Sequence, residues 1–171
     1  MFEVFINNKK INSLIDIKIR KSFKEIADSF TAAAVFLGEK LNFDPGDIVR
    51  INYKNKLFFT GYIDFINGSI SGSQRNINIG GRSRPALLVD STAIYKTGAF
   101  YKQNFKFIVS ELLAPFGIDP VFNKVKNKTY DKFTIEQGET VFSVLDRLTA
   151  ENGLIMYSNF NGDLVFNSPR F

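Results

Sequence analysis

Residues 43–66 read FDPGDIVRINYKNKLFFTGYIDFI, and their pattern decides the fold of the first half of the chain. Asp44-Pro45-Gly46-Asp47 places proline and glycine at the two central positions of a type II turn. On both sides of Lys54-Asn55-Lys56, apolar residues alternate with other residues, as they do in half-buried strands. The stretch therefore predicts two strands joined by a turn, in a region of antiparallel sheet.

The same period of two continues outward from this stretch. The alternating apolar positions are Phe2, Val4 and Ile6; Ile15, Ile17 and Ile19; Phe30, Ala32, Ala34 and Phe36; and Ile77 and Ile79. Asn7-Asn8 and Asn67-Gly68 are turn signals, and the second predicts a hairpin. Residues 23–27 are also compatible with a helical turn. Five to seven short strands with turns between them predict a small barrel or sandwich.

The last third of the chain changes to a helical period. Two apolar stripes have the spacing of amphipathic helices: Phe105, Ile108, Val109, Leu112, Leu113 and Phe116; and Val141, Val144, Leu145 and Leu148. Gly117 and Gly153 follow these stripes, where helices commonly end. Residues 133–135 form a predicted strand, and residues 154–157 and 164–166 a predicted hairpin.

Together these patterns predict an α+β protein. A small antiparallel β-barrel or sandwich lobe is followed by a small αβαββ lobe. We expect a β-barrel-like domain over residues 1–95 and a small α+β domain over residues 96–171, joined by a linker near residues 91–103.

Composition removes several classes of chemistry. The 171 residues include 19 Phe and 6 Tyr but no His, Cys or Trp, and the net charge is 22 − 17 = +5. The chain therefore has no Ser-His-Asp or Cys-His nucleophilic site, no Cys/His zinc site and no disulfide. We predict no cofactor, no metal and no catalytic residue. No apolar run approaches the roughly 18 residues of a membrane span, and no secretory signal begins the chain.

One glycine-rich stretch is a candidate site. Gly80-Gly81-Arg82-Ser83 follows a predicted strand and precedes a possible short helix over residues 86–95. Backbone N–H groups of such a turn are able to cradle an anion, but the spacing of a nucleotide-binding loop is absent. We favour a structural corner formed by Gly81, Arg82, Ser83 and Asp90. Arg82 and Asp90 are a candidate ion pair across it.

Two further groups have competing interpretations. Asp44 with Asp47, and Glu136 with Glu139, are paired carboxylates, but turn and helix-start chemistry explains all four. Phe100 and Tyr101 lie in the predicted linker. They form a partner surface if they are exposed, and they pack back onto the β lobe if they are not.

Two stretches carry a family resemblance. The first runs from Asp44-Pro45-Gly46-Asp47 through Phe59-Thr60-Gly61 to Gly81-Arg82-Ser83 and Leu88-Val89-Asp90. The second runs from Gln137-Gly138-Glu139-Thr140 through Leu145-Asp146-Arg147-Leu148 to Asn161-Gly162-Asp163. Their order and spacing resemble the hub proteins of contractile phage baseplates. These are the phage Mu-like P family, related late control tail proteins and the N-terminal part of type VI secretion spike proteins.

The resemblance implies a structural, non-enzymatic protein of a phage or prophage tail. Such hubs form a trimeric ring that adapts the tail tube to the spike, so the implied partners are further copies, tube and spike proteins. The implied location is the virion tail baseplate, after synthesis in the bacterial cytoplasm. Family members are about twice as long, so we expect a part or a shortened relative of a longer hub, in which part of the ring interface is missing.

Two other functions stay open at this point. Residues 133–142 also resemble the start of a LysM peptidoglycan-binding module. Such modules continue into a second helix, whereas here an apolar strand follows. The predicted barrel, the aromatic residues and the positive charge also fit an OB-like single-strand nucleic-acid binder. Basic runs are more often solvated faces, so we expect no specific nucleic-acid or membrane binding.

Overall fold

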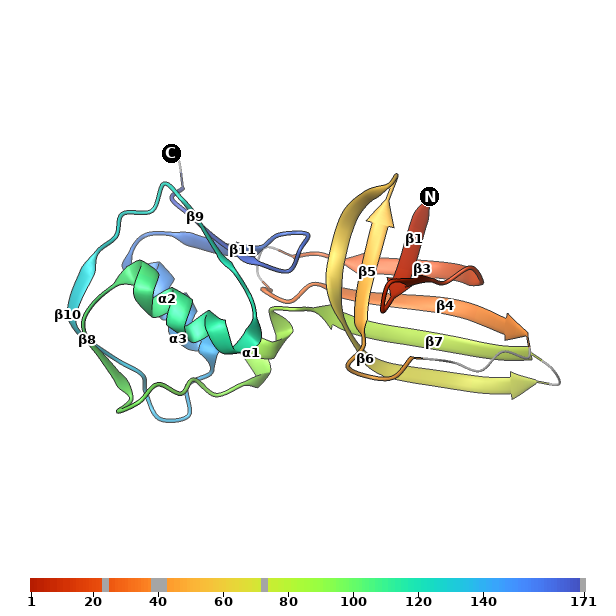
Figure 1. Ribbon diagram of the computed structural model, residues 1–171, viewed down its shortest axis with the longest axis horizontal. Coiled ribbons are helices and arrows are strands. Elements are labelled where there is room, and N and C mark those ends of the chain that lie inside the picture. The colour runs from red at the N-terminus through yellow and green to blue at the C-terminus, as the bar shows by residue number, and fades with distance from the viewer. Residues whose placement is uncertain (23–24, 38–42, 72–73, 170–171) are drawn as a thin grey trace. The chain divides into compact units, whose positions relative to one another are not determined.

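The computed structural model describes residues 1–22, 25–37, 43–71 and 74–169 (Figure 1). The chain divides into two compact units. Unit 1 comprises Met1–Arg84 with Phe160–Gly162, and unit 2 comprises Pro85–Asn159 with Asp163–Phe171. The division falls after Arg84, ahead of the boundary between residues 95 and 96 expected from the sequence. The predicted α+β class is confirmed, since unit 1 is a sheet and unit 2 combines helices with strands.

Unit 1 is one antiparallel sheet of seven strands, in the order β2-β1-β5-β6-β7-β4-β3. Its strands are β1 (Phe2–Ile6), β2 (Lys9–Lys10), β3 (Leu14–Arg20), β4 (Ser29–Leu37), β5 (Ile48–Tyr53), β6 (Lys56–Ser71) and β7 (Gln74–Ser83). The first part of β6 pairs with β5 and the rest with β7. Figure 1 shows β5 crossing β7 steeply, with β6 bending from one to the other. The sheet thus curls into a half-barrel.

The inner face of this curled sheet holds the apolar core of unit 1. The alternating residues predicted from the sequence supply it: Val4, Ile6, Phe30, Ala32, Ala34, Val49, Ile51, Phe59, Ile63, Ile77 and Ile79 are all buried. Phe43 joins them from the segment before β5. Burying each of the valine, isoleucine and phenylalanine side chains contributes about 1.5–3 kcal/mol, which is the main force that holds the sheet in its curl.

Two local predictions for unit 1 are wrong. Asn67-Gly68 is not a turn, because β6 continues through it and pairs Asn67 with Asn78. The pairing of β6 with β7 continues as far as Ser71 and Gln74. Ile15 does not share the buried face of β3, because the register of β3 against β4 shifts between Leu14 and Asp16 and leaves Ile15 67% exposed. Of the predicted helical turn, residues 23 and 24 lie outside the described residues.

Unit 2 contains three helices, a 3₁₀ turn and two small sheets in the part of the chain that is described. Its elements are α1 (Ala86–Asp90), β8 (Ala99–Asn104), α2 (Phe105–Leu113), η1 (Ala114–Phe116), β9 (Pro120–Asn123), β10 (Thr129–Thr134), α3 (Val141–Glu151), β11 (Ile155–Ser158) and β12 (Leu164–Asn167). β8 pairs with β10, and β12 lies between β11 and β9. Both predicted helices, the strand near residue 133 and the terminal hairpin are confirmed.

The predicted linker is not a separate connector. Residues 99–104 are strand β8, and they follow a segment that is hydrogen-bonded within unit 2. The backbone N–H of Ala93 donates to the carbonyl of Glu139 at 2.8 Å, and the N–H of Val141 donates to Ser91 at 3.0 Å. The sequence also gave no prediction of β9, which pairs in parallel with β12.

Helix caps and an aromatic cluster fix the interior of unit 2. Asn104 caps α2 by accepting from the N–H of Phe107, and Thr140 caps α3 by accepting from Ser143. Phe105 and Phe166 are fully buried and meet edge to face, with ring centroids 5.7 Å apart. Across the described residues, no helix has the length and apolar character needed to cross a membrane.

Candidate functional site

Where β6 bends and begins to pair with β7, the backbones of the two strands lie closer together than residues with side chains would allow. A β-carbon added at Gly81 would lie 1.9 Å from the carbonyl oxygen of Tyr62, and one at Gly61 would lie 2.1 Å from that of Arg82. Gly80 lies under the ring of Phe65, which fills the space that a side chain would take. Glycine is thus required here by close approach rather than by an unusual backbone conformation.

Polar side chains hold the outer side of the same bend. The register of β6 against β7 shifts between Ile63 and Phe65, which leaves Asp64 as the extra residue of a β-bulge. Its carboxylate accepts a 2.7 Å hydrogen bond from Nε of Arg82. Both side chains are more than a third exposed, so this ion pair adds little stability by itself, and its main effect is to orient the bulge.

Ser83 closes the end of β7 on a buried polar contact. Its side chain is 3% exposed, and its Oγ accepts from the backbone N–H of Asp28 at 2.9 Å. The N–H of Ser83 donates in return to the carbonyl of Asp28 at 2.8 Å. Lys21 forms an ion pair with the Asp28 carboxylate. Sequence reasoning missed Asp28 and Asp64, because their partners are far away in the sequence.

The structure brings three of the four predicted corner residues together. Gly81, Arg82 and Ser83 are consecutive in β7, and Gly81 is paired with Phe30 and Ile63 on either side, so its backbone belongs to the ladder rather than to an anion-binding turn. Asp90 lies at the end of α1 in unit 2. Its predicted pair with Arg82, and the role of the four residues as a corner, stay predictions.

The predicted partner surface divides into one buried and one exposed residue. Phe100 is fully buried and stacks on Tyr95, with ring centroids 3.7 Å apart, so it is not part of any surface of the folded chain. It packs against Tyr95 inside unit 2. Tyr101 is 56% exposed. A partner site at Tyr101 stays a prediction.

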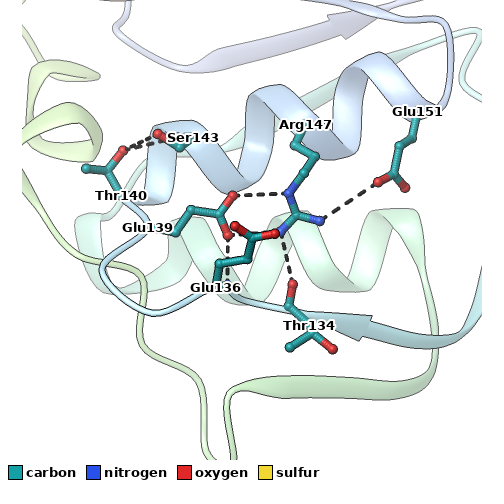
Figure 2. A network of polar contacts seen from close by, with 7 residues as sticks. All are labelled: Thr134, Glu136, Glu139, Thr140, Ser143, Arg147 and Glu151. Carbon is teal, nitrogen blue, oxygen red and sulfur yellow. Dashed lines mark hydrogen bonds and ion pairs between the residues drawn. The ribbon is translucent and has the colours of Figure 1, made fainter.

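A second polar site joins the start of α3 to β10 (Figure 2). Arg147 donates from Nε and Nη2 to the two carboxylate oxygens of Glu139, at 3.1 and 2.9 Å. Nη2 also donates to the carbonyl of Thr134 at 3.0 Å, and Nη1 lies 3.8 Å from Glu151. The guanidinium covers the ring of Phe133 at 4.6 Å. One arginine thus ties helix, turn and strand together.

The electrostatics of this site follow from its geometry. The hydrogen bonds from Arg147 hold the pKa of Glu139 below its ordinary value, and the same bonds raise the pKa of Arg147. Oε2 of Glu139 also accepts from the N–H of Glu136 at 2.9 Å, across a turn in which Gly138 has a φ of 79°. Glu136 and Glu139 therefore stabilise a turn, as the sequence indicated, and are not poised as an acid and base pair.

The other carboxylate pair is structural as well. Asp47 accepts from the backbone N–H of Asp44 at 2.8 Å, and Gly46 has the positive φ, 95°, that the predicted type II turn needs. Within residues 1–22, 25–37, 43–71 and 74–169, no three carboxylates gather in a way that would hold a metal ion.

Comparison with known proteins identifies the second unit. Residues 85–168 match the family described as the second domain of gp44-like baseplate hub proteins. Unit 2 is thus similar to the second domain of these hub proteins. The match begins at Pro85, where the contacts of the chain divide. The resemblance to contractile-phage baseplate hub proteins seen in the sequence is confirmed.

Relatives of known sequence or structure extend this similarity beyond the gp44-like domain. The baseplate hub protein gp44 of Escherichia phage Mu is 29% identical over 126 residues, which cover 72% of this chain and 33% of gp44. The 43 kDa tail protein of prophage MuSo2 from Shewanella oneidensis superposes with a TM-score of 0.85 at 27% identity, over 96% of this chain and 52% of that one.

Two more distant structures share the fold alone. A tail protein from Neisseria meningitidis MC58 superposes with a TM-score of 0.81 at 23% identity, over 96% of this chain and 49% of that one. The E. coli c3393 protein, a component of the type VI secretion system, gives 0.68 at 15% identity, over 98% of this chain and 49% of that one. The chain thus spans a third of gp44 and about half of these solved proteins.

Proposed function

We propose that this chain is a structural component of the baseplate hub of a phage or prophage contractile tail, where it helps to adapt the tail tube to the spike. The observation that carries the proposal is the superposition on the MuSo2 tail protein over 96% of the chain, with a TM-score of 0.85. The gp44-like match of unit 2 supports it from sequence alone. A curled sheet and a small α+β domain are built to present surfaces to other tail proteins.

The finer parts of this proposal concern partners and location. We infer that copies of the chain associate in a ring, with three copies as the family resemblance implies, and that tube and spike proteins bind on either side. The ring would be part of the virion baseplate after synthesis in the host cytoplasm. We further propose that the chain is not an enzyme, and that Gly81, Arg82, Ser83 and Asp90 keep the shape of the hub.

Deletion of the coding sequence from the phage or prophage that carries it tests the function directly. Electron microscopy of induced lysates should show no complete contractile tails, and a plasmid copy of the gene should restore them. Complete, infectious tails without the gene would overturn the proposal. Neighbouring genes for tail tube, tape measure and spike proteins would support it.

Binding assays test the two other functions raised by the sequence. The full chain is titrated with muropeptide fragments of peptidoglycan and with single-stranded oligothymidine. We expect weak binding that salt removes, because surface charge alone would cause it. Low-micromolar binding to either ligand that persists in high salt would contradict a purely structural role.

A further inference from the structure

Charge is segregated within unit 2. Residues 96–132 contain seven lysines against three carboxylates, 7 − 3 = +4, whereas residues 133–151 contain Arg147 against four carboxylates, 1 − 4 = −3. Over residues 85–171 the basic and acidic residues balance, 9 − 9 = 0. Unit 2 therefore presents a basic region and an acidic region with no net charge.

Residues 96–132 include an exposed aromatic residue, Tyr101. Tyr101 in β8 lies directly opposite Lys132 in β10, and the Lys132 ammonium lies 5.8 Å from the centroid of the tyrosine ring. Their strand neighbours Phe100 and Phe133 are buried, so Tyr101 and Lys132 point outward. We call Tyr101 and Lys132 together the tyrosine-lysine face.

This face has the chemistry of a protein contact. Tyrosine is enriched among the residues that dominate interface energies, because it buries a large ring at a low entropic cost. The cation–π contact holds the Lys132 side chain over Tyr101 and so limits the conformational entropy that docking would cost. Among the described residues, the sheet that carries the face consists of β10 and β8 alone, so each of these strands has one edge without a partner strand.

The acidic region offers the complementary charge. Glu136, Glu139 and Glu151 all face the single cation of Arg147, which leaves two negative charges in excess along α3 and the turn before it. Asp146 is an exposed residue of the same helix. A cation from another molecule would therefore be attracted to the exposed side of α3.

We propose that the tyrosine-lysine face of one copy of this chain docks on the acidic, exposed side of α3 of a second copy, with Lys132 near Asp146. This inference rests on the proposed function, since it names the surfaces through which copies of the hub associate. A nucleic acid is the less suitable partner for this face. Unit 2 has no net charge to attract it, and residues 1–84 carry the whole excess, 13 − 8 = +5.

Charge reversal on each side tests the pairing. Sedimentation velocity of the full chain is measured over a range of concentrations for the wild type, Lys132→Glu and Asp146→Lys. The wild type should associate as its concentration rises, and each reversal should raise the dissociation constant roughly tenfold or more, because like charges then face each other. Combining both changes in one chain should restore association, because every contact then pairs opposite charges again.

Two controls separate this contact from general charge effects. Lys126→Glu makes the same charge change at an exposed lysine of the connector before β10, outside the tyrosine-lysine face, and should leave association unchanged. Tyr101→Ala should weaken association without changing the net charge. Circular dichroism of each variant verifies that unit 2 is folded.

The outcomes distinguish this inference from the proposed function. A wild type that stays monomeric at every concentration overturns the inference, as does association that Lys132→Glu leaves unchanged or that the double variant fails to restore. Loss of oligothymidine binding in Lys132→Glu, with association unaltered, would assign the face to nucleic acid and overturn it too. The gene deletion tests the hub role separately. If the inference fails and the hub role holds, copies of the chain associate through other surfaces.

Discussion

The bend of unit 1 and the Arg147 cluster of unit 2 both hold neighbouring segments together. The bend does so by close contact of backbones, and the cluster by one long charged side chain. At the bend, Gly61 and Gly81 let two backbones touch because neither has a side chain. In α3, the long side chain of Arg147 reaches across to a strand and a turn. Where two backbones touch at glycine, no larger residue fits unless a strand moves. The stability that an ion pair contributes instead falls gradually when a partner is altered, and it depends on pH.

The two units also differ in how their charges are used. The edge strands of the unit 1 sheet are β2 and β3, and they carry Lys9, Lys10, Lys18 and Arg20. Charged residues on an edge strand discourage unplanned pairing with another sheet. In unit 2 the charges separate into a basic and an acidic region, which favours one defined contact. The comparison suggests that unit 1 is protected against association and unit 2 is suited to it.

The largest effect is expected from Gly81→Ala. The new methyl group would lie 1.9 Å from the carbonyl oxygen of Tyr62, so β6 and β7 must separate. Overpacking of this kind costs about 3 kcal/mol. Amide hydrogen exchange in β6 and β7 should report this loss, while exchange in α3 stays the same.

Gly68→Ala is the matched control in the same sheet. Its added methyl group would have its nearest neighbour at 3.6 Å, which is an ordinary contact. We expect the free energy of unfolding to change by less than about 1 kcal/mol. Alanine restricts the unfolded chain, which offsets part of any loss. Equal losses for the two variants would contradict the close-approach explanation.

Arg147→Leu should have the next largest effect, and only in unit 2. Leucine keeps an apolar cover over Phe133 but leaves the Glu139 carboxylate, whose side chain is 13% exposed, without its charged donors. Hydrogen bonds to charged groups contribute about 1.5–3 kcal/mol, and the partial exposure of Arg147 places the expected loss near the lower end. Hydrogen exchange in α3 and β10 measures it.

Arg20→Leu provides the comparison for an exposed pair. Arg20 and Glu25 meet at 3.3 Å with side chains 74% and 56% exposed. Such pairs contribute about 0–1 kcal/mol. If Arg20→Leu destabilises its unit as much as Arg147→Leu does, burial is not what distinguishes the two ion pairs.

The elements that the sequence predicted correctly are those fixed by local pattern. Alternation placed the core strands because each strand has one buried face, and the spacing of the Leu112 and Leu148 stripes placed both helices. The Asn67-Gly68 prediction was wrong because a turn signal is only a local preference. The pairing of β6 with β7, which continues through Asn67 and Gly68, outweighs this local preference.

The site residues were harder to predict because they depend on distant partners. Asp28 and Asp64 gain their roles from Ser83 and Arg82, which no spacing rule connects to them. Phe100 and Tyr101 are adjacent in the sequence, and only the register of β8 against β10 decides which one is buried. Arg147 belonged to a recognised motif, but its contact with Thr134 depends on the packing of α3 against the end of β10.

The response of unit 2 to acid should be smaller than its response to Arg147→Leu. Arg147 holds the pKa of Glu139 below its ordinary value of 4.5, so the folded state binds this proton less tightly than the unfolded state does. The stabilisation is therefore complete above the unfolded pKa and is lost as the pH falls through the lower folded pKa. Urea unfolding at several pH values, followed by amide NMR signals of α3, measures this loss.

Glu139→Gln identifies the group responsible. Glutamine cannot lose a proton, so the variant should be less stable than the wild type at neutral pH, and the difference between them should shrink in acid. A difference that stays constant down to low pH would mean that the ion pair does not link the stability of unit 2 to protonation.

The smallest effect is expected from Ile15→Thr, which tests the bulge in β3. Ile15 is 67% exposed, so removing its apolar surface should change the stability of unit 1 by less than about 0.5 kcal/mol. Ile17 packs against the core of unit 1, and Ile17→Thr should cost about 1 kcal/mol because buried apolar area is lost. Urea unfolding of both variants compares them. Equal costs would mean that the register shift between Leu14 and Asp16 does not turn Ile15 outward, and that the alternation read from the sequence continues unbroken through β3.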